Sequence, residues 1–137
     1  MKQHRDWHYT NIPYSPLGAP VLPPPEPNVL TELRRLIGKQ LEPYDLPWLL
    51  HLAGDAHQPL HTTARFLEGQ VDRDGKPSGD QGGNLVWISS RENLHWYWDG
   101  LLGSSETEEY LAALVKSMRR SVTPERPPQL DPEVWVR

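Results

Sequence analysis

The stretch from His51 to His61 constrains this chain more than any other, because it places ionisable side chains around a compulsory helix end. Asp55 follows His51 by four positions, so a helix would present both side chains on one face, one turn apart. Pro59 disfavours helical geometry in the residue before it, so the helix must end near Gln58. The chain then turns, which leaves His61 free to point back toward the space that His51 and Asp55 face.

A second pair with the same spacing, His95 and Asp99, lies on a stretch that Asn93 would cap as a helix. A lone histidine and aspartate four residues apart usually form a surface ion pair. Two such pairs on apolar and aromatic helices, with a further histidine beyond a proline, instead favour a metal site. The chain contains no cysteine. Any metal must therefore be bound by nitrogen and oxygen, and disulfides are excluded.

Sets of three histidine and aspartate ligands are typical of catalytic zinc, because they leave a coordination position for water. Zinc draws the pKa of its bound water toward about 7 and so makes it a nucleophile at neutral pH; two or more zinc ions about 3.5–4 Å apart could clamp a phosphoryl group. The formal charge of −4 argues against a basic groove for nucleic acid. Bound zinc would add positive charge within the site, so a phosphate substrate is not excluded.

The length of 137 residues predicts one domain, residues 1–137, and a hydrophobic content of 36% predicts a thin core. Fifteen prolines indicate long irregular connections. No run of residues is apolar and long enough to suggest a membrane helix, and the polar start at residues 1–6 does not lead us to expect a signal peptide in this stretch. We expect a monomer.

Hydrophobic periodicity predicts a mainly α chain. Helices are expected over residues 29–41, from an Asp45 cap to Gln58, from an Asn93 cap to Asp99, and from a Ser105/Glu108 capping box to Arg120, with one further turn at 131–135. The helix that begins at Asp45 is apolar nearly all round, which predicts a buried helix. Non-helical segments are expected as an extended stretch at 1–11, a proline-rich connection at 12–28, a long loop at 62–83 and a short hairpin strand at 85–88.

Three ordered motifs closely resemble the S1/P1 nuclease family: the run from His51 to His61, the segment Asp80-Gln-Gly-Gly-Asn84, and the segment Asn93-Leu-His95-x-x-Trp98-Asp99. The resemblance extends outward to residues 7–9 and 132–135. That family shares the phospholipase C/P1 nuclease fold, a mostly helical domain around three zinc ions. The resemblance therefore implies such a helical domain, with long loops and a short β-hairpin.

The resemblance implies a role for each matching ionisable residue. For the first zinc it implies the ligands His8, His51 and Asp55, with Asp55 also bridging toward a third zinc and so acting in catalysis. For the second zinc it implies a complete protein ligand set of His61, His95 and Asp99.

The resemblance also implies a nucleotide pocket and a substrate. Tyr9 stands where the family stacks an aromatic ring on a nucleobase, and Asn11 stands where some members use an aspartate to contact base edges. The same pocket is lined in the family by the segment that matches Gly82, Gly83 and Asn84. The implied substrates are single-stranded DNA, RNA or nucleotides, hydrolysed by a zinc-dependent endonuclease with 3′-nucleotidase activity as a further expectation.

Family members begin with a tryptophan whose amino group binds zinc, followed by a histidine and an aspartate ligand, and these have no counterpart before His8. We therefore expect a truncated domain that lacks the N-terminal ligands and the C-terminal helices, and that binds one to three zinc ions. Two alternatives stay open: a zinc-binding remnant without turnover, and a phospholipase C-like phosphodiesterase. His57 is either a partner that orients a ligand histidine or a histidine satisfied elsewhere, and Asp80 has no assigned role. By resemblance the protein is expected to be secreted or periplasmic.

Overall fold

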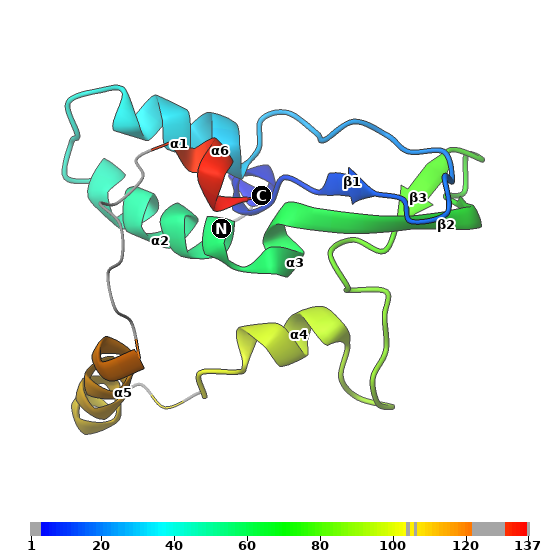
Figure 1. Ribbon diagram of the computed structural model, residues 1–137. Coiled ribbons are helices and arrows are strands. Elements are labelled where there is room, and N and C mark those ends of the chain that lie inside the picture. The colour runs from blue at the N-terminus through cyan, green and yellow to red at the C-terminus, as the bar shows by residue number, and fades with distance from the viewer. Residues whose placement is uncertain (1–3, 104, 106, 122–130, 137) are drawn as a thin grey trace.

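The computed structural model of this chain describes residues 4–103, 105, 107–121 and 131–136. Helices predominate, and three strands form a small sheet in the order β1-β2-β3 (Figure 1). The mainly α prediction is therefore confirmed. The elements in chain order are η1 (Arg5–His8, a 3₁₀-helical turn), β1 (Ile12–Tyr14), α1 (Val29–Ile37), α2 (Asp45–His57), α3 (Pro59–Thr62), β2 (Thr63–Val71), β3 (Pro77–Gly79), α4 (Leu94–Asp99), α5 (Glu108–Ser121) and α6 (Pro132–Trp135).

The core lies between α1 and α2. Leu33 and Leu36 of α1 meet Leu52 of α2, and all three side chains are fully buried, because the apolar residues of α1 recur at helical spacing on one face. Asn28 caps α1 by accepting hydrogen bonds from two backbone N–H groups of its first turn. The turn η1 and helix α6 pack against α1 and α2 as well. This core fixes η1 and α2, which carry the candidate ligands His8, His51 and Asp55.

The prediction that α2 is buried all round is wrong. Leu46 and Leu50 of α2 are 50% and 67% exposed, whereas Leu52 and Ala56 are buried. In the part of the chain that the structure describes, α1, α3, η1 and α6 are the elements that pack most extensively on α2. They cover one face only, so apolarity around the helix did not translate into burial.

The prediction of a long loop over residues 62–83 is also wrong, because this segment forms a β-hairpin. Ala64 and Phe66 of β2 are buried while Arg65 between them is exposed, the alternation of a half-buried strand. β3 pairs antiparallel with β2, and Asp72 organises the turn by accepting hydrogen bonds from two backbone N–H groups. Two apolar positions are too few for the alternation to stand out in the sequence.

The parallel pairing of β1 with β2 joins the two ends of the candidate site. Ile12 lies opposite Thr63 in this pairing. Two residues before each strand partner, the Thr10 N–H donates to the His61 carbonyl at 2.9 Å. His61 is thereby placed beside the segment that carries His8.

Residues 85–88 do not form the predicted hairpin strand; Trp87 makes an isolated bridge with Asn93 instead. The predicted cap of α4 is confirmed, since the Asn93 side chain accepts a hydrogen bond from the Trp96 N–H at 2.8 Å. In Figure 1, α4 and α5 lie apart from the α1–α2 layer. The remaining helix, α6, begins at the predicted turn, with Asp131 as its cap.

Several predicted boundaries and caps differ from the structure. Residues 5–8 form a helical turn rather than an extended stretch, and α1 ends at Ile37 rather than at residue 41. Asp45 is the first residue of α2 and not its cap; its carboxylate accepts a hydrogen bond from the Glu42 N–H. At the start of α5, Thr107 rather than Ser105 accepts a hydrogen bond from the Tyr110 N–H. Among the described residues, no helix combines the length and apolarity needed to cross a membrane.

Candidate metal centre and pocket

Three hydrogen bonds from two elements fix the backbone of residues 8–10. The Tyr9 carbonyl accepts from the Val29 N–H at the start of α1 (3.1 Å), and the Thr10 N–H donates to the His61 carbonyl (2.9 Å). The His8 carbonyl accepts from Nδ1 of the His61 ring at 2.7 Å. The His8 side chain therefore projects from a segment whose position is set by both α1 and α3.

The first group of candidate ligands consists of His8, His51 and Asp55. His8 Nδ1 lies 3.0 Å from Asp55 Oδ2 and 3.0 Å from His51 Nε2, and the latter two atoms are 3.3 Å apart. The α-helical spacing of His51 and Asp55 brings these two together, as the sequence predicted. The Asp55 side chain is largely buried, at 13% exposure, while His51 is more than half exposed.

The second group consists of His61, His95 and Asp99. His61 Nε2 lies 3.5 Å from Asp99 Oδ1, and His95 Nε2 lies 3.5 Å from Asp99 Oδ2. The two imidazole rings stack, with centroids 4.8 Å apart. Both rings are largely buried, at 16% and 17% exposure, and their Nε2 atoms face the Asp99 carboxylate.

Backbone carbonyls fix the tautomers of both histidines in the second group. A carbonyl oxygen only accepts, so the ring nitrogen that contacts it must carry the hydrogen. His61 Nδ1 donates to the His8 carbonyl, and His95 Nδ1 donates to the Gly82 carbonyl, each at 2.7 Å. In the neutral rings Nε2 therefore carries the lone pair and points at Asp99. Ligand histidines in metal sites are oriented in this way.

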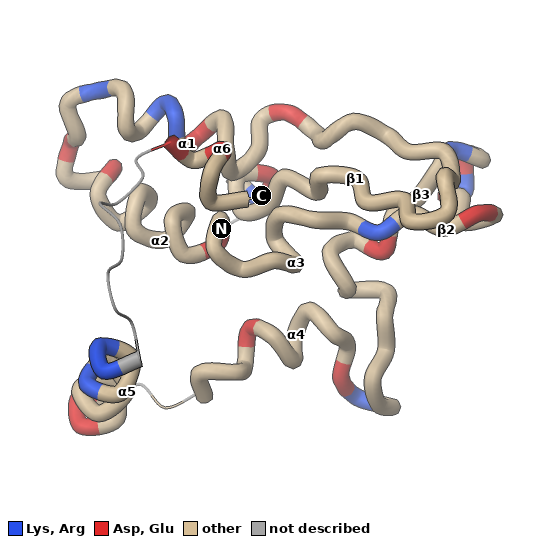
Figure 2. The backbone as a smooth tube through the Cα atoms, viewed as in Figure 1, with Lys and Arg blue, Asp and Glu red and all other residues tan. Residues whose placement is uncertain are grey.

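The two groups adjoin one another. Asp55 Oδ1, the carboxylate oxygen on the far side from His51, lies 3.6 Å from His61 Nδ1. Helices α2, α3 and α4, which carry five of the six side chains, contain no lysine or arginine, as Figure 2 shows. Two carboxylates thus face four imidazoles without a neighbouring cation from these helices.

The first group could hold a metal ion, and its geometry fits one in two respects. In a tetrahedral site with zinc–nitrogen distances near 2.0–2.1 Å, neighbouring ligand atoms are about 3.3–3.4 Å apart, close to the spacing within the first group. Each imidazole nitrogen also offers either one N–H or one lone pair. His8 Nδ1 therefore cannot both donate to Asp55 and accept from His51, and the three contacts among these side chains cannot all be hydrogen bonds. A cation at the point where these atoms converge would remove that conflict.

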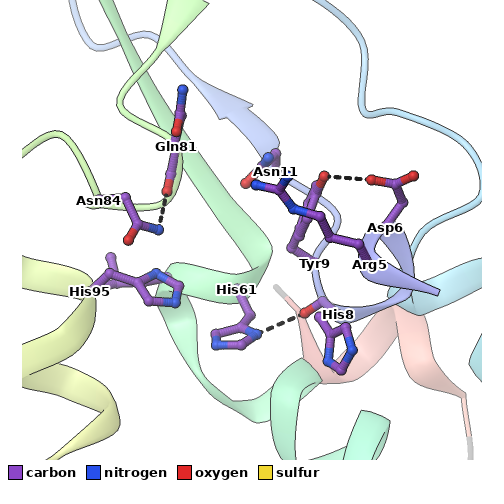
Figure 3. Close-up of a pocket in the computed structure, with 10 residues that line it drawn as sticks. Arg5, Asp6, His8, Tyr9, Asn11, His61, Gln81, Asn84 and His95 are labelled. Atoms are coloured by element: carbon purple, nitrogen blue, oxygen red, sulfur yellow. Dashed lines mark hydrogen bonds between the residues drawn. The ribbon is translucent and has the colours of Figure 1, made fainter. Parts of the chain in front are cut away.

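A pocket of about 630 Å³ opens beside the two groups (Figure 3). Its lining combines candidate ligands with polar and aromatic side chains from η1, the residues just after it, α3, the segment before α4 and α4 itself: Arg5, Asp6, His8, Tyr9, Asn11, Leu60, His61, Gln81, Asn84 and His95. Three of the predicted substrate residues, Tyr9, Asn11 and Asn84, are among them. The sequence analysis missed four lining residues: Arg5, Asp6, Leu60 and Gln81. Only the charges of Arg5 and Asp6, next to the His8 motif, could have drawn attention to them.

The polar groups of the pocket are partly engaged already. The Tyr9 hydroxyl donates to Asp6 Oδ1 at 2.9 Å, and burial together with that hydrogen bond raises the pKa of Tyr9. Asn84 Nδ2 donates to the Gln81 carbonyl, which leaves its side-chain oxygen available. Arg5 has no ion-pair partner among the described residues, and in Figure 3 its side chain lies beside Tyr9 and extends toward Asn11.

Gly82 and Gly83 are not part of this lining; they pack behind it. Gly82 has a φ of +61°, and a Cβ there would lie 2.0 Å from the Leu60 carbonyl oxygen. At Gly83 a Cβ would contact Leu60 and Leu94 side-chain atoms at 3.3 Å. The two glycines therefore let the chain pass close to α3, and this close passage places the Gly82 carbonyl against the His95 ring.

The remaining histidines and Asp80 lie outside both groups. His57 Nδ1 donates to the Ala53 carbonyl, and its ring lies against the Trp135 ring, so it is satisfied as a non-ligand. The His4 ring lies tilted against the Trp7 ring, with centroids 3.7 Å apart. Asp80 is buried and accepts a hydrogen bond from the Arg65 N–H at 2.9 Å, which ties the hairpin to the loop before α4.

Fold and site together define a mainly helical protein with a two-part candidate metal centre beside a pocket. The chain belongs to the S1/P1 nuclease family, which it matches over residues 1–135. Endonuclease 5 of Arabidopsis thaliana is 40% identical over 76 residues, 53% of this chain and 21% of that protein. Endonuclease 4 of the same plant is 32% identical over 85 residues, 57% of this chain and 24% of that protein.

The chain thus spans about a quarter or less of the length of these curated relatives. No solved structure matches it significantly.

Proposed function

We propose that this chain forms a single zinc domain of the phospholipase C/P1 nuclease type, residues 1–137, that hydrolyses phosphodiester bonds in single-stranded nucleic acid. The observation that carries the proposal is the placement of two His/His/Asp groups against a pocket with an aromatic wall. Family membership and relatives named endonucleases support it. Hydrolysis of 3′-nucleotides and a secreted or periplasmic location are part of the same proposal.

Six side chains would hold the zinc. In the first group His8 offers Nδ1, His51 offers Nε2 and Asp55 offers Oδ2. In the second, His61 and His95 offer Nε2 and Asp99 offers its carboxylate. When bound, zinc supplies Lewis acidity and lowers the pKa of coordinated water toward about 7.

Asp55 is the proposed catalytic residue because its two oxygens face different groups. Oδ2 lies within the first group, and Oδ1 points toward His61 of the second. The carboxylate is held nearly buried, at 13% exposure, so its charge is weakly screened by solvent. A substrate phosphate bound between the two groups would lie next to the fixed Asp55 carboxylate.

The pocket residues would bind the nucleotide. The Tyr9 ring offers a stacking surface, which tolerates different bases and suits single strands. Asn11 and Asn84 line the same pocket and can hydrogen-bond to base edges. Arg5 would face the phosphate, since it is a cation that lines the pocket with no ion-pair partner among the described residues.

The test is zinc content and hydrolysis measured on the same preparation of the 137-residue chain. We expect bound zinc, cleavage of single-stranded DNA or RNA oligonucleotides, and loss of cleavage with a chelator. D99A and H61A should each abolish one bound zinc and the activity, whereas H57A, which changes a histidine outside both groups, should retain both. Metal-free active protein, or cleavage indifferent to the chelator, would refute the proposal.

The same assays separate the alternatives. One zinc per chain without turnover would identify a zinc-binding remnant, and cleavage of phospholipid in liposomes but not of oligonucleotides would identify a phospholipase C-like enzyme. Release of phosphate from 3′-AMP tests the nucleotidase activity. Detection of the native protein in extracellular or periplasmic fractions, against a cytoplasmic marker, tests the location.

A further inference from the structure

Helix α4 carries two of the three candidate ligands of the second group, yet it has little packing of its own. None of the elements described here packs on α4 to the extent that α1 packs on α2. Trp96 and Trp98 are 63% and 40% exposed, and the Asp99 side chain is 45% exposed. Hydrophobic contact therefore does not fix the position of Asp99.

Hydrogen bonds hold α4 at both ends. At its start, the Leu94 N–H donates to the Val86 carbonyl, and the His95 ring donates to the Gly82 carbonyl. At its end, Nε2 of Gln58 donates to Asp99 Oδ1 at 2.9 Å. Among the described residues, this is the hydrogen bond that the Asp99 carboxylate accepts.

Gln58 is itself rigidly placed at the junction of α2 and α3. Its backbone N–H donates to the Asp55 carbonyl and its carbonyl accepts from the His61 N–H, each at 3.0 Å. Its side-chain oxygen accepts from the Leu60 N–H and caps α3. Because that contact requires an acceptor, the amide oxygen must face Leu60, and the NH₂ group must face Asp99.

We propose that Gln58 is a positioning residue that orients the Asp99 carboxylate toward His61 and His95. One residue thus links the helix of the first group, the turn that carries His61 and the aspartate of the second group. A neutral amide donor can fix Asp99 without adding a charge to the cluster. The inference rests on the proposed function, since it takes the second group to be a zinc site.

The variant Q58E separates the two roles of the side chain. Glutamate keeps an oxygen that can cap the Leu60 N–H, but it removes the donor and places a like charge beside Asp99. Q70E is the matched control, because Gln70 also accepts a backbone hydrogen bond through its side-chain oxygen, from Leu67 on the hairpin. Q58S is a neutral second variant, since serine is a good helix cap too short to reach Asp99.

The measurement is a Zn²⁺ titration against a competing chelator, with the second site assigned as the binding that D99A removes. We expect Q58E and Q58S to weaken this site about 10- to 100-fold, as loss of an orienting partner typically does, and Q70E to leave it unchanged. The melting temperature of metal-free Q58E should stay near that of the wild type, since the cap is kept. If Q58E does not fold, Q58S provides the same comparison.

Wild-type second-site affinity in the Gln58 variants, or a higher affinity, would overturn the inference. Its failure can be told apart from failure of the proposed function. Zinc binding by the wild type without any hydrolysis would refute only the proposed function, while the loss of affinity in Q58E would still support the role of Gln58. Absence of zinc from the wild type would overturn both.

Discussion

Replacing Gly82 with alanine should damage the second metal group through a backbone that cannot move freely. A Cβ at this position would lie 2.0 Å from the Leu60 carbonyl oxygen, whereas real Cβ contacts are essentially never shorter than 3.0 Å. The segment must therefore shift by about 1 Å relative to α3. The Gly82 carbonyl that receives the His95 ring at 2.7 Å would move with it, beyond good hydrogen-bond geometry.

Two contributions to the effect can be separated by matched variants. The φ of +61° at Gly82 costs an alanine about 1–2 kcal/mol, whatever the surrounding space. G75A at the hairpin tip has the same cost, since Gly75 has a φ of +77° but open space around its Cβ position. G54A lies between His51 and Asp55 on α2, has neither problem, and should stabilise the helix by up to about 1 kcal/mol.

Denaturant titration and zinc titration of the four proteins check the reasoning. We expect G75A to lose about 1–2 kcal/mol of stability with both metal affinities intact. G82A should lose more than G75A, and its second-site affinity should fall about 10- to 100-fold, because His95 loses its orienting partner. A G82A protein with wild-type zinc affinity at the second site would refute the link between this glycine and His95.

Three further outcomes follow from the structure. R5A should raise KM for oligonucleotides about fivefold or less with little change in kcat, as expected for an exposed ion pair of at most about 1 kcal/mol. R73A, on the hairpin, is its control in the same steady-state assay. H57A should lower the free energy of unfolding by about 1 kcal/mol through loss of its contact with Trp135, with zinc stoichiometry unchanged by elemental analysis. The Lys39 ammonium, 2.7 Å from the Asp45 carboxylate, and the Glu42 N–H hold the pKa of Asp45 below its usual value near 3.8. The ionised carboxylate therefore stabilises the fold above that pH, and this stabilisation is lost as the pH falls through the lowered pKa. In denaturant titrations of metal-free protein at pH 7 and pH 3, D45N should therefore lose less stability on acidification than the wild type.

The grouping of ionisable residues could be predicted because it depends on local spacing. His51 with Asp55 and His95 with Asp99 are each one helical turn apart, and Pro59 dictates where the first helix must end. The ligand roles of these residues stay predictions until metal is measured. The position of His8 beside them could not be derived from spacing, because it depends on pairing between segments about 50 residues apart in the chain.

The failures have the same origin in non-local structure. Whether α2 is buried depends on which elements surround it, and the hairpin depends on β3 supplying a partner for β2. By resemblance, Gly82 and Gly83 were expected to line the nucleotide pocket, but they pack against the backbone and side chain of Leu60 instead. The sequence predicted Gln58 only as the end of a helix, because its hydrogen bond to Asp99 depends on where α4 lies relative to α2.

The parallel pairing of β1 with β2 also determines where this chain can tolerate insertions. His8 and His61 are brought together by a register in which Ile12 faces Thr63, so the number of residues from each histidine to its strand is fixed. One extra residue between Asn11 and Ile12 would shift His8 past His61 by about 3.3 Å. Within the irregular connection that follows β1, residues 20–23 are exposed and lie outside any strand register, so we expect changes of length to be tolerated there. Homologues and engineered variants should therefore differ in that connection, while the four-residue step from His8 to Ile12 stays constant.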